Sequence, residues 1–168
     1  GGYYFFTVVT YKRRKLFYDE RARVLLRESI EKVNLSRPFR TVAFCLLPDH
    51  LHCAWEMKND DFDYSIRWRL IKSGFSRNYN DTVKATVTAS REKKGEKGIW
   101  QRRFWEHKIR NEKDLQKHVD YIHYNPVKHG LVTDVSLWPW STYHKYIDKG
   151  FYNNGNNFTI LDDVQVNE

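Results

Sequence analysis

The chain has 168 residues, which is enough for one domain and too short for two ordinary ones. It carries 29 Lys and Arg against 21 Asp and Glu, so its net charge is +8 and its pI is near 9.4. Aromatic residues make up 16% of the chain, which argues against global disorder, and no apolar run reaches the roughly eighteen residues of a membrane helix.

The first half of the chain alternates between strand and helix signals. Tyr3–Tyr11 is rich in aromatic and β-branched residues and predicts a strand, which the basic turn Arg13–Lys15 follows. Apolar residues recur at helical spacing over Asp19–Asn34. Beyond a proline, Thr41–Leu47 and His50–Met57 predict two strands joined by a tight Pro-Asp turn.

The middle of the chain predicts a second helix and then a break. Apolar residues four apart over Phe62–Gly74 indicate the helix, with Asp61 or Asp63 at its positive end. Asn80–Gly98 is basic and holds few large apolar residues, so we expect a mobile basic loop there. Trp100–Arg110 predicts a fourth strand region.

The last third predicts a helix over Glu112–Asn125, which Pro126 and Gly130 break or kink. Leu131–Phe151 is aromatic and partly helical in pattern. We expect residues 1–152 to form one domain and 153–168, rich in Asn and Gly at its start, to be a flexible C-terminal tail.

The order strand, helix, strand, strand, helix, strand predicts an α+β fold. It is the split βαββαβ arrangement of ferredoxin-like and RNA-recognition (RRM-like) folds, here with additional C-terminal helices. Two helices cover one face of such a sheet. The other face is open to a ligand or a further helix, so fold alone does not decide function.

Two histidines stand two residues apart in the predicted third strand. His50 and His52 would share one face, while Leu51, Cys53 and Trp55 would point into the core on the other. Two neutral imidazoles side by side can bind one divalent metal. The alternative is a pair of surface histidines with no ligand.

The predicted helix over Glu112–Asn125 has a polar face beside its apolar one. Four side chains on that face fall within about 60° of one another: Asp114, His118, Tyr121 and Asn125. A tyrosine in this position is either a reactive group or a half-buried core residue with a bonded hydroxyl.

Five segments together resemble one family. They are Tyr4–Arg13 (YFFTVVTYKR), Leu46–His52 (LLPDHLH), Trp100–Ile109 (WQRRFWEHKI), Tyr121–Val132 (YIHYNPVKHGLV) and Trp138–Tyr143 (WPWSTY). In this order the chain resembles the REP-associated tyrosine transposases, the bacterial branch of the single-tyrosine HUH transposases. The most specific signal is YIHYNPVKHGLV downstream of PDHLH.

The resemblance implies an HUH endonuclease fold with one divalent metal, Mg²⁺ or Mn²⁺. His50 and His52 would be metal ligands, and Asn125 stands where related insertion-sequence transposases have a ligating Gln. The Asn side chain is one methylene shorter, so Glu106 and His107 on the next strand are alternative third ligands.

The resemblance also implies the reaction and the partner. Tyr121 would attack single-stranded DNA, leaving a 5′-phosphotyrosine and a free 3′-OH that can rejoin another end. The DNA would be a short palindromic hairpin with a guide tetranucleotide, and the protein a monomer or a homodimer. The two cysteines, too few for a disulfide scaffold, favour a cytoplasmic setting, for which the resemblance implies a bacterial, nucleoid-associated protein.

Basic residues in three segments are candidate contacts to a DNA backbone: Arg13, Arg14, Lys15, Arg102, Arg103, Lys108, and in the loop Arg91, Lys93 and Lys94. Each could equally be a solvated surface charge. Four tryptophans could stack on bases, although core packing is the better expectation for most: Trp100, Trp105, Trp138 and Trp140.

Two other functions have to be weighed. A non-catalytic RRM-like module that binds single-stranded nucleic acid would need a Gly-aromatic signature on its central strands, which the sequence lacks. A zinc site could combine Cys45, His50, His52 and Cys53, but strand alternation turns Cys53 away from the histidines.

Overall fold

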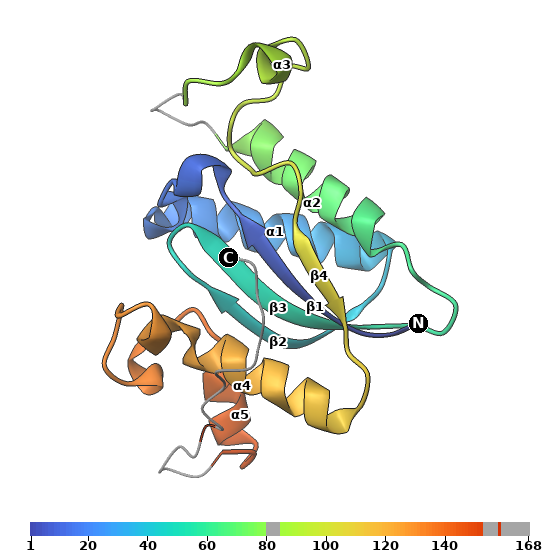
Figure 1. The fold of residues 1–168 in the computed structure, drawn as a ribbon, viewed down its shortest axis with the longest axis vertical. Coiled ribbons are helices and arrows are strands. Elements are labelled where there is room, and N and C mark those ends of the chain that lie inside the picture. The colour runs from blue at the N-terminus through green and yellow to red at the C-terminus, as the bar shows by residue number, and fades with distance from the viewer. Residues whose placement is uncertain (80–84, 153–157, 159–168) are drawn as a thin grey trace.

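A computed structural model describes residues 1–79, 85–152 and 158 of the chain. Four antiparallel strands form one sheet in the order β2-β3-β1-β4 (Figure 1). The strands are β1 (Gly2–Val9), β2 (Arg40–Leu46), β3 (His50–Met57) and β4 (Trp105–Lys108). This is the ferredoxin-like arrangement, so the predicted α+β fold is confirmed.

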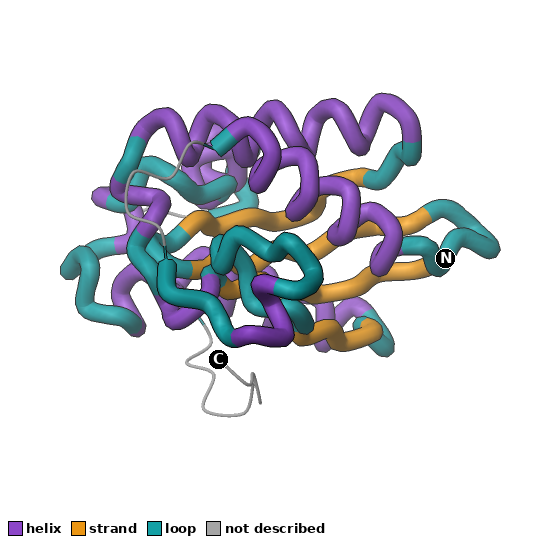
Figure 2. The backbone as a smooth tube through the Cα atoms, turned by 90° about the horizontal axis from the view of Figure 1, so that it is seen from above, coloured by secondary structure: helices purple, strands orange, loops and turns teal. Residues whose placement is uncertain are grey.

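Helices α1 (Glu20–Ser36) and α2 (Tyr64–Asn78) pack together on one face of the sheet. The Asp19 side chain caps α1 by accepting a hydrogen bond from the backbone of Arg21. Large buried side chains fill the space beneath the helices, among them Phe6, Trp55 and Trp68, whose indole stacks on that of Trp55. Figure 2 shows the strands running between this helical layer and the segments on the other face.

Helix α2 begins later than its apolar spacing predicts. Its N-cap is Asp63, and Phe62 before it is 55% exposed. Asp61 binds the guanidinium of Arg67, whose side chain is almost fully buried. The first residue of the predicted apolar row therefore lies outside both the helix and the core.

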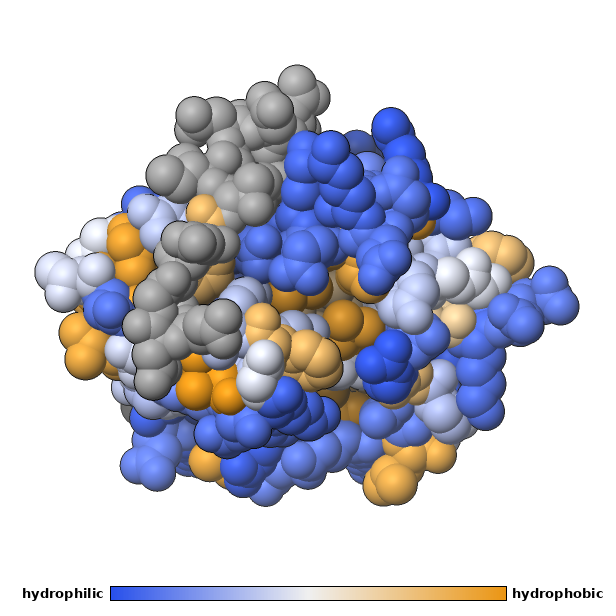
Figure 3. Space-filling view, turned by 90° about the horizontal axis from the view of Figure 1, so that it is seen from below, coloured by the Kyte–Doolittle hydropathy of each residue, from blue (hydrophilic) through white to orange (hydrophobic). Residues whose placement is uncertain are grey.

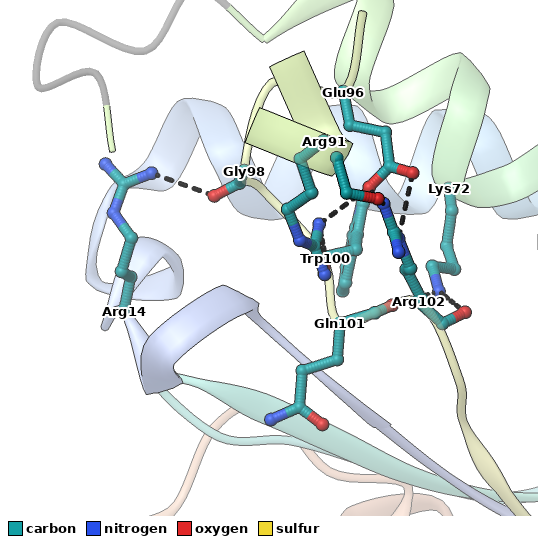
Figure 4. A network of polar contacts seen from close by, with 9 residues as sticks. Arg14, Lys72, Arg91, Glu96, Gly98, Trp100, Gln101 and Arg102 are labelled. Atoms are coloured by element: carbon teal, nitrogen blue, oxygen red, sulfur yellow. Dashed lines mark hydrogen bonds and ion pairs between the residues drawn. The ribbon is translucent and has the colours of Figure 1, made fainter. Parts of the chain in front are cut away.

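The segment predicted as a mobile basic loop has local structure where it is described. Residues 80–84 lie outside the described residues, but 85–98 contain a short helix, α3 (Ala89–Glu92). The Arg91 side chain is buried and donates to Glu96 and to the Trp100 carbonyl (Figure 4). These bonds, which join residues five and nine positions apart, organise a segment whose apolar content is too low to predict a helix.

Strand β4 is shorter than the predicted strand region. Trp100 forms only an isolated bridge with Thr10, and regular pairing begins at Trp105. The ammonium group of Lys72 on α2 donates to the backbone carbonyls of Gln101 and Arg102. The Gln101 amide keeps one bond to β1, at the Val9 carbonyl, so this segment follows the sheet edge without regular pairing.

Helix α4 (Glu112–Lys128) covers the opposite face of the sheet. Pro126 does not end it, contrary to the prediction, because a proline in the last turn removes only one helical bond. The helix ends at Lys128. Beyond it, Gly130, whose φ is +65°, and Leu131 donate their amides to the carbonyls of Val127 and Pro126. Hydrophilic side chains cover much of the molecular surface on this side (Figure 3).

The C-terminal segment adds the predicted helical structure, a 3-10 turn at Val135–Leu137 and α5 (Tyr143–Asp148). Between them, the backbone follows strand β2: Leu46 donates to the Trp140 carbonyl and Thr142 donates to the Phe44 carbonyl. The expected flexible tail, 153–168, lies outside the described residues apart from Phe158. None of the helices in the described ranges has the length and apolarity needed to cross a membrane.

Candidate active site

The two histidines of β3 lie side by side, as predicted. Their ring centroids are 4.9 Å apart and the rings are nearly perpendicular, on the sheet face that α4 covers. Leu51, Cys53 and Trp55 belong to the core on the other face. Both imidazoles are buried, with 1% and 0% of His50 and His52 exposed, so the surface-histidine alternative is wrong.

Hydrogen bonds orient both rings through Nδ1. His50 Nδ1 lies 2.6 Å from Asp49 Oδ1, and His52 Nδ1 lies 2.9 Å from Thr7 Oγ1. Burial opposes ionisation of Asp49, but hydrogen bonds from His50 and Arg13 prevail and hold the pKa of its carboxyl below the usual value. A proton on His50 Nδ1, shared with this carboxylate, leaves the lone pair on Nε2 for a ligand.

Buried atoms without partners occur on both β3 and α4. His50 Nε2 has no hydrogen-bond partner among the described residues, and neither does either polar atom of the fully buried Asn125 side chain. A buried amide without hydrogen bonds is costly and uncommon in folded proteins. A cation bound by imidazole nitrogen and amide oxygen would satisfy these atoms, so the residues fit a divalent metal.

Tyr121 reaches the same place from α4. Its ring centroid lies 5.3 Å from that of His52, edge against face at 75°, and only 5% of the residue is exposed. The hydroxyl accepts a hydrogen bond of 3.0 Å from Lys128 Nζ, and the ammonium lies 4.7 Å from the ring centroid. The tyrosine is therefore buried with a bonded hydroxyl and also lies against His52.

Four residues of the site were not predicted: Thr7, Asp49, Lys128 and His129. His129 places its ring 5.0 Å from that of His50, from just beyond the end of α4. The spacing from Tyr121 to Lys128 is seven residues, two helical turns, which could have placed them on one face. The partners from β1 and from the turn before β3 depend on strand pairing that the sequence does not reveal.

The two alternative third ligands lie elsewhere. Glu106 pairs with Phe6 and so projects from the sheet face opposite the histidines, which excludes it as a ligand there. His107 is on the correct face, but its Nε2 lies 3.0 Å from Asp114 Oδ2 and its ring stacks on His118 at 4.7 Å. The Phe5 ring lies between this cluster and His52, with centroids 4.9 Å from His118 and 5.6 Å from His52.

The cluster of His107, Asp114 and His118 is a second group of metal-ligating side chains. One ligand atom from each residue lies within 4.8 Å of the others. The Asp114 carboxylate also accepts the Arg110 amide, and His118 Nδ1 lies 2.8 Å from the Asp114 carbonyl. These side chains are thus already hydrogen-bonded to one another, unlike His50 Nε2 and Asn125.

The cysteine-histidine zinc site is wrong. Cys53 lies in the core on the far side of the sheet. Cys45 pairs with His52 and shares its face, but burial raises the pKa of its thiol far above the usual value. Because Cys53 is on the other face, the four side chains cannot share one ion.

Some of the basic candidate residues are exposed, and others are bonded to groups within the protein. Exposed side chains are Lys15, Lys93, Lys94, Arg103 and Lys108. Arg13 forms an ion pair of 3.1 Å with Asp49, Arg14 donates to the Gly98 carbonyl, and Arg102 binds Glu96. Arg91 is buried and bonded within the fold, so its expected role as a DNA contact is not supported. Trp100 and Trp138 are buried, as core packing predicted.

A ferredoxin-like sheet whose central strand presents two histidines to a helical tyrosine defines the class of this protein, a single-tyrosine transposase. Comparison with known proteins gives the family. A family model described as IS200-like transposase matches residues 1–125, and the chain belongs to this family.

Individual relatives agree with this assignment. The REP-associated tyrosine transposase of Escherichia coli K12 is 45% identical over 152 residues, 90% of this chain and 82% of that protein. A Haemophilus influenzae protein is 43% identical over 155 residues, 90% of this chain and 85% of its own length. A solved REP-associated tyrosine transposase bound to a REP hairpin superposes with a TM-score of 0.75 at 44% identity, covering 91% of this chain and 83% of that one.

Proposed function

We propose that this transposase cleaves and rejoins single-stranded DNA beside palindromic hairpins, with Tyr121 as the nucleophile. The observation that carries the proposal is the contact between Tyr121 and His52, whose ring centroids lie 5.3 Å apart. The relative solved with a REP hairpin supports the same kind of partner here, to which the family resemblance adds a guide tetranucleotide.

A divalent metal would be held by His50, His52 and Asn125, whose buried atoms fit it. Mg²⁺ or Mn²⁺ suits phosphodiester chemistry at an oxygen-containing site. When bound, the cation supplies Lewis-acid charge that polarises the scissile phosphate. Asp49 and Thr7 hold the imidazoles in the orientation that this requires.

The chain's own residues account for the rest of the reaction. The phenolic oxygen of Tyr121 loses its proton to water and attacks phosphorus, forming an O–P bond as the bond from phosphorus to the 3′ oxygen breaks. The 3′ oxygen leaves with the electron pair and takes up a proton. The Lys128 ammonium, already bonded to the phenolic oxygen, stabilises negative charge there. Because the phosphotyrosine keeps the phosphoester bond, rejoining needs no ATP.

Exposed basic side chains would bind the DNA backbone. Lys15, Arg103 and Lys108 lie on the surface, and Lys93 and Lys94 follow α3. Contacts of this kind provide affinity that falls steeply with salt and carry little sequence information.

The test is a denaturing gel for a covalent protein–DNA species, formed with a single-stranded oligonucleotide carrying a REP palindrome and Mn²⁺. We expect wild type to form the adduct and Tyr121→Phe to bind the hairpin without forming it. Tyr124→Phe is the matched control, since Tyr124 is on the same helix but 38% exposed. An adduct in Tyr121→Phe would assign the nucleophile to another residue.

A further inference from the structure

A groove of about 560 Å³ lies between α2 and the segment 95–104 that leads into β4. Six cationic side chains line it, three from α2, one from α3 and two from the segment: Arg69, Lys72, Arg77, Arg91, Lys97 and Arg102. Figure 4 shows Lys72, Arg91 and Arg102 among them. The ring of Phe104, half-buried against Trp68, forms part of its wall. We call this feature the α2 groove.

Positive charge in the α2 groove is only partly neutralised. Glu96 is the one acidic residue of its described lining, and its carboxylate already binds Arg91 and Arg102. Burial lowers the pKa of Lys72 to about 8. Arg69 and Arg77 are exposed and form no hydrogen bond or ion pair with the rest of the described chain, so their guanidiniums are available to an anion.

The spacing of these charges fits a chain of phosphates better than a single one. Arg69 and Arg77 are eight residues apart on α2, which places them about 12 Å apart along the helix axis. Grooves that track a nucleic-acid backbone with cations and offer an aromatic surface for bases bind single strands without strong sequence preference.

Backbone hydrogen bonds join the wall of the α2 groove to β1, the strand that pairs with β3. The Gln101 amide donates to the Val9 carbonyl, and the Tyr11 amide donates to the Ile99 carbonyl, each at 2.9 Å. Val9 is the register partner of His50. The groove wall and His50 therefore lie at the same end of the sheet, on its opposite faces, with β1 between them.

We infer that the α2 groove binds the single-stranded DNA that flanks the hairpin and leads it toward the histidine pair. This inference rests on the proposed function, because it assigns a surface to the same substrate. Arg69 and Arg77 contact phosphates, and Phe104 offers its ring to a base.

The experiment compares Arg69→Gln/Arg77→Gln with a matched control, Arg27→Gln/Lys32→Gln, which removes the same charge from exposed positions of α1. Binding is measured by fluorescence anisotropy on a REP hairpin with and without an oligo-dT flank. For a single strand, each phosphate contact steepens the fall of log K with log salt by about 0.7. Over the tenfold interval from 1 M to 0.1 M salt, one contact therefore contributes about fivefold in affinity at 0.1 M. We expect about 25-fold weaker binding of the flanked hairpin by the groove variant, a gap that closes toward 1 M salt.

The expected pattern includes unchanged affinity for the blunt hairpin and wild-type affinity of the control. Equal binding of the flanked hairpin by variant and control would overturn the inference, and an equal loss on the blunt hairpin would assign the groove to duplex DNA instead. Failure of the proposed function looks different, because wild type itself would then form no covalent adduct at saturating DNA.

Discussion

Replacing Lys128 by Met should slow the formation of the covalent protein–DNA species while leaving hairpin affinity unchanged. Lys128 Nζ lies 3.0 Å from the Tyr121 hydroxyl oxygen. For a full negative charge on that oxygen, Coulomb's law gives about 1.4 kcal/mol in bulk water and about 5.5 kcal/mol at an effective dielectric constant of 20. Because Lys128 is exposed, the value should lie near the lower limit, at about 1.5–3 kcal/mol, the usual range for a hydrogen bond to a charged group.

That energy corresponds to a loss of about 10- to 150-fold in the cleavage rate. Single-turnover kinetics at saturating hairpin DNA measures the chemical step apart from binding. Lys128→Arg should retain most of the rate, and methylammonium should partly restore the rate of Lys128→Ala. Lys113→Met, an exposed lysine in the first turn of the same helix, is the control. If Lys128→Met cleaved at the wild-type rate, the hydrogen bond would have no role in stabilising the nucleophile.

Three further outcomes follow from the site and the fold. His50→Ala, or EDTA added to wild type, should stop cleavage on the gel without stopping hairpin binding; undiminished cleavage in EDTA would contradict the metal site. Asn125→Ala should also abolish cleavage yet unfold in urea within about 1 kcal/mol of wild type, because it removes two unsatisfied buried atoms; a large loss of stability with intact cleavage would show a structural role. Hydrogen bonds from Arg67 lower the pKa of Asp61, so its stabilising contribution is complete above about pH 4 and is lost as the pH falls through the lowered pKa. Asp61→Asn should cost about 3 kcal/mol near neutral pH by leaving the Arg67 charge buried, and urea melts that showed no loss would contradict this.

The sequence predicted those features that depend on local periodicity. Alternation along β3 placed His50 and His52 on one face and Trp55 on the other, because side chains of a strand alternate regardless of its neighbours. Helical spacing likewise placed Tyr121 and Asn125 on one side of α4. The order of the elements was sufficient for the sheet topology, since the split βαββαβ pattern has few alternatives.

Features that depend on contacts or boundaries outside helix and strand periodicity were not predictable. Regular pairing of β4 with β1 begins only at Trp105, and before it the Arg102 carbonyl accepts a hydrogen bond from Lys72, thirty residues upstream. The burial of Arg91 depends on Glu96 and the Trp100 carbonyl, and no local pattern distinguishes it from the exposed lysines that follow it. The exposure of Phe62 was not predictable either. Phe62 has the i+4 spacing of the apolar row, but α2 begins only at Tyr64, so its side chain lies before the helix and is exposed.

A network of hydrogen bonds joins α4 to the C-terminal segment and, through it, to β2. His123 Nε2 lies 2.9 Å from Thr142 Oγ1, and the backbone of Thr142 donates to the Phe44 carbonyl on β2. The Tyr152 hydroxyl lies 2.9 Å from His123 Nδ1 and donates to the Asp120 carboxylate. Burial lowers the pKa of His123 to about 3, so the ring stays neutral and its bonds persist at any physiological pH.

Under the proposed function, this network assigns the C-terminal segment a part in catalysis without contact with the substrate. The network connects α4 to β2, which pairs with β3 in the sheet. It therefore helps to fix the position of the helix that carries Tyr121 relative to the strand that carries His52. A displacement of about 1 Å between a nucleophile and its target can cost about a hundredfold in rate. On that proposal, the aromatic and polar residues after Gly130 act as positioning residues, because they help to hold the Tyr121 ring beside that of His52.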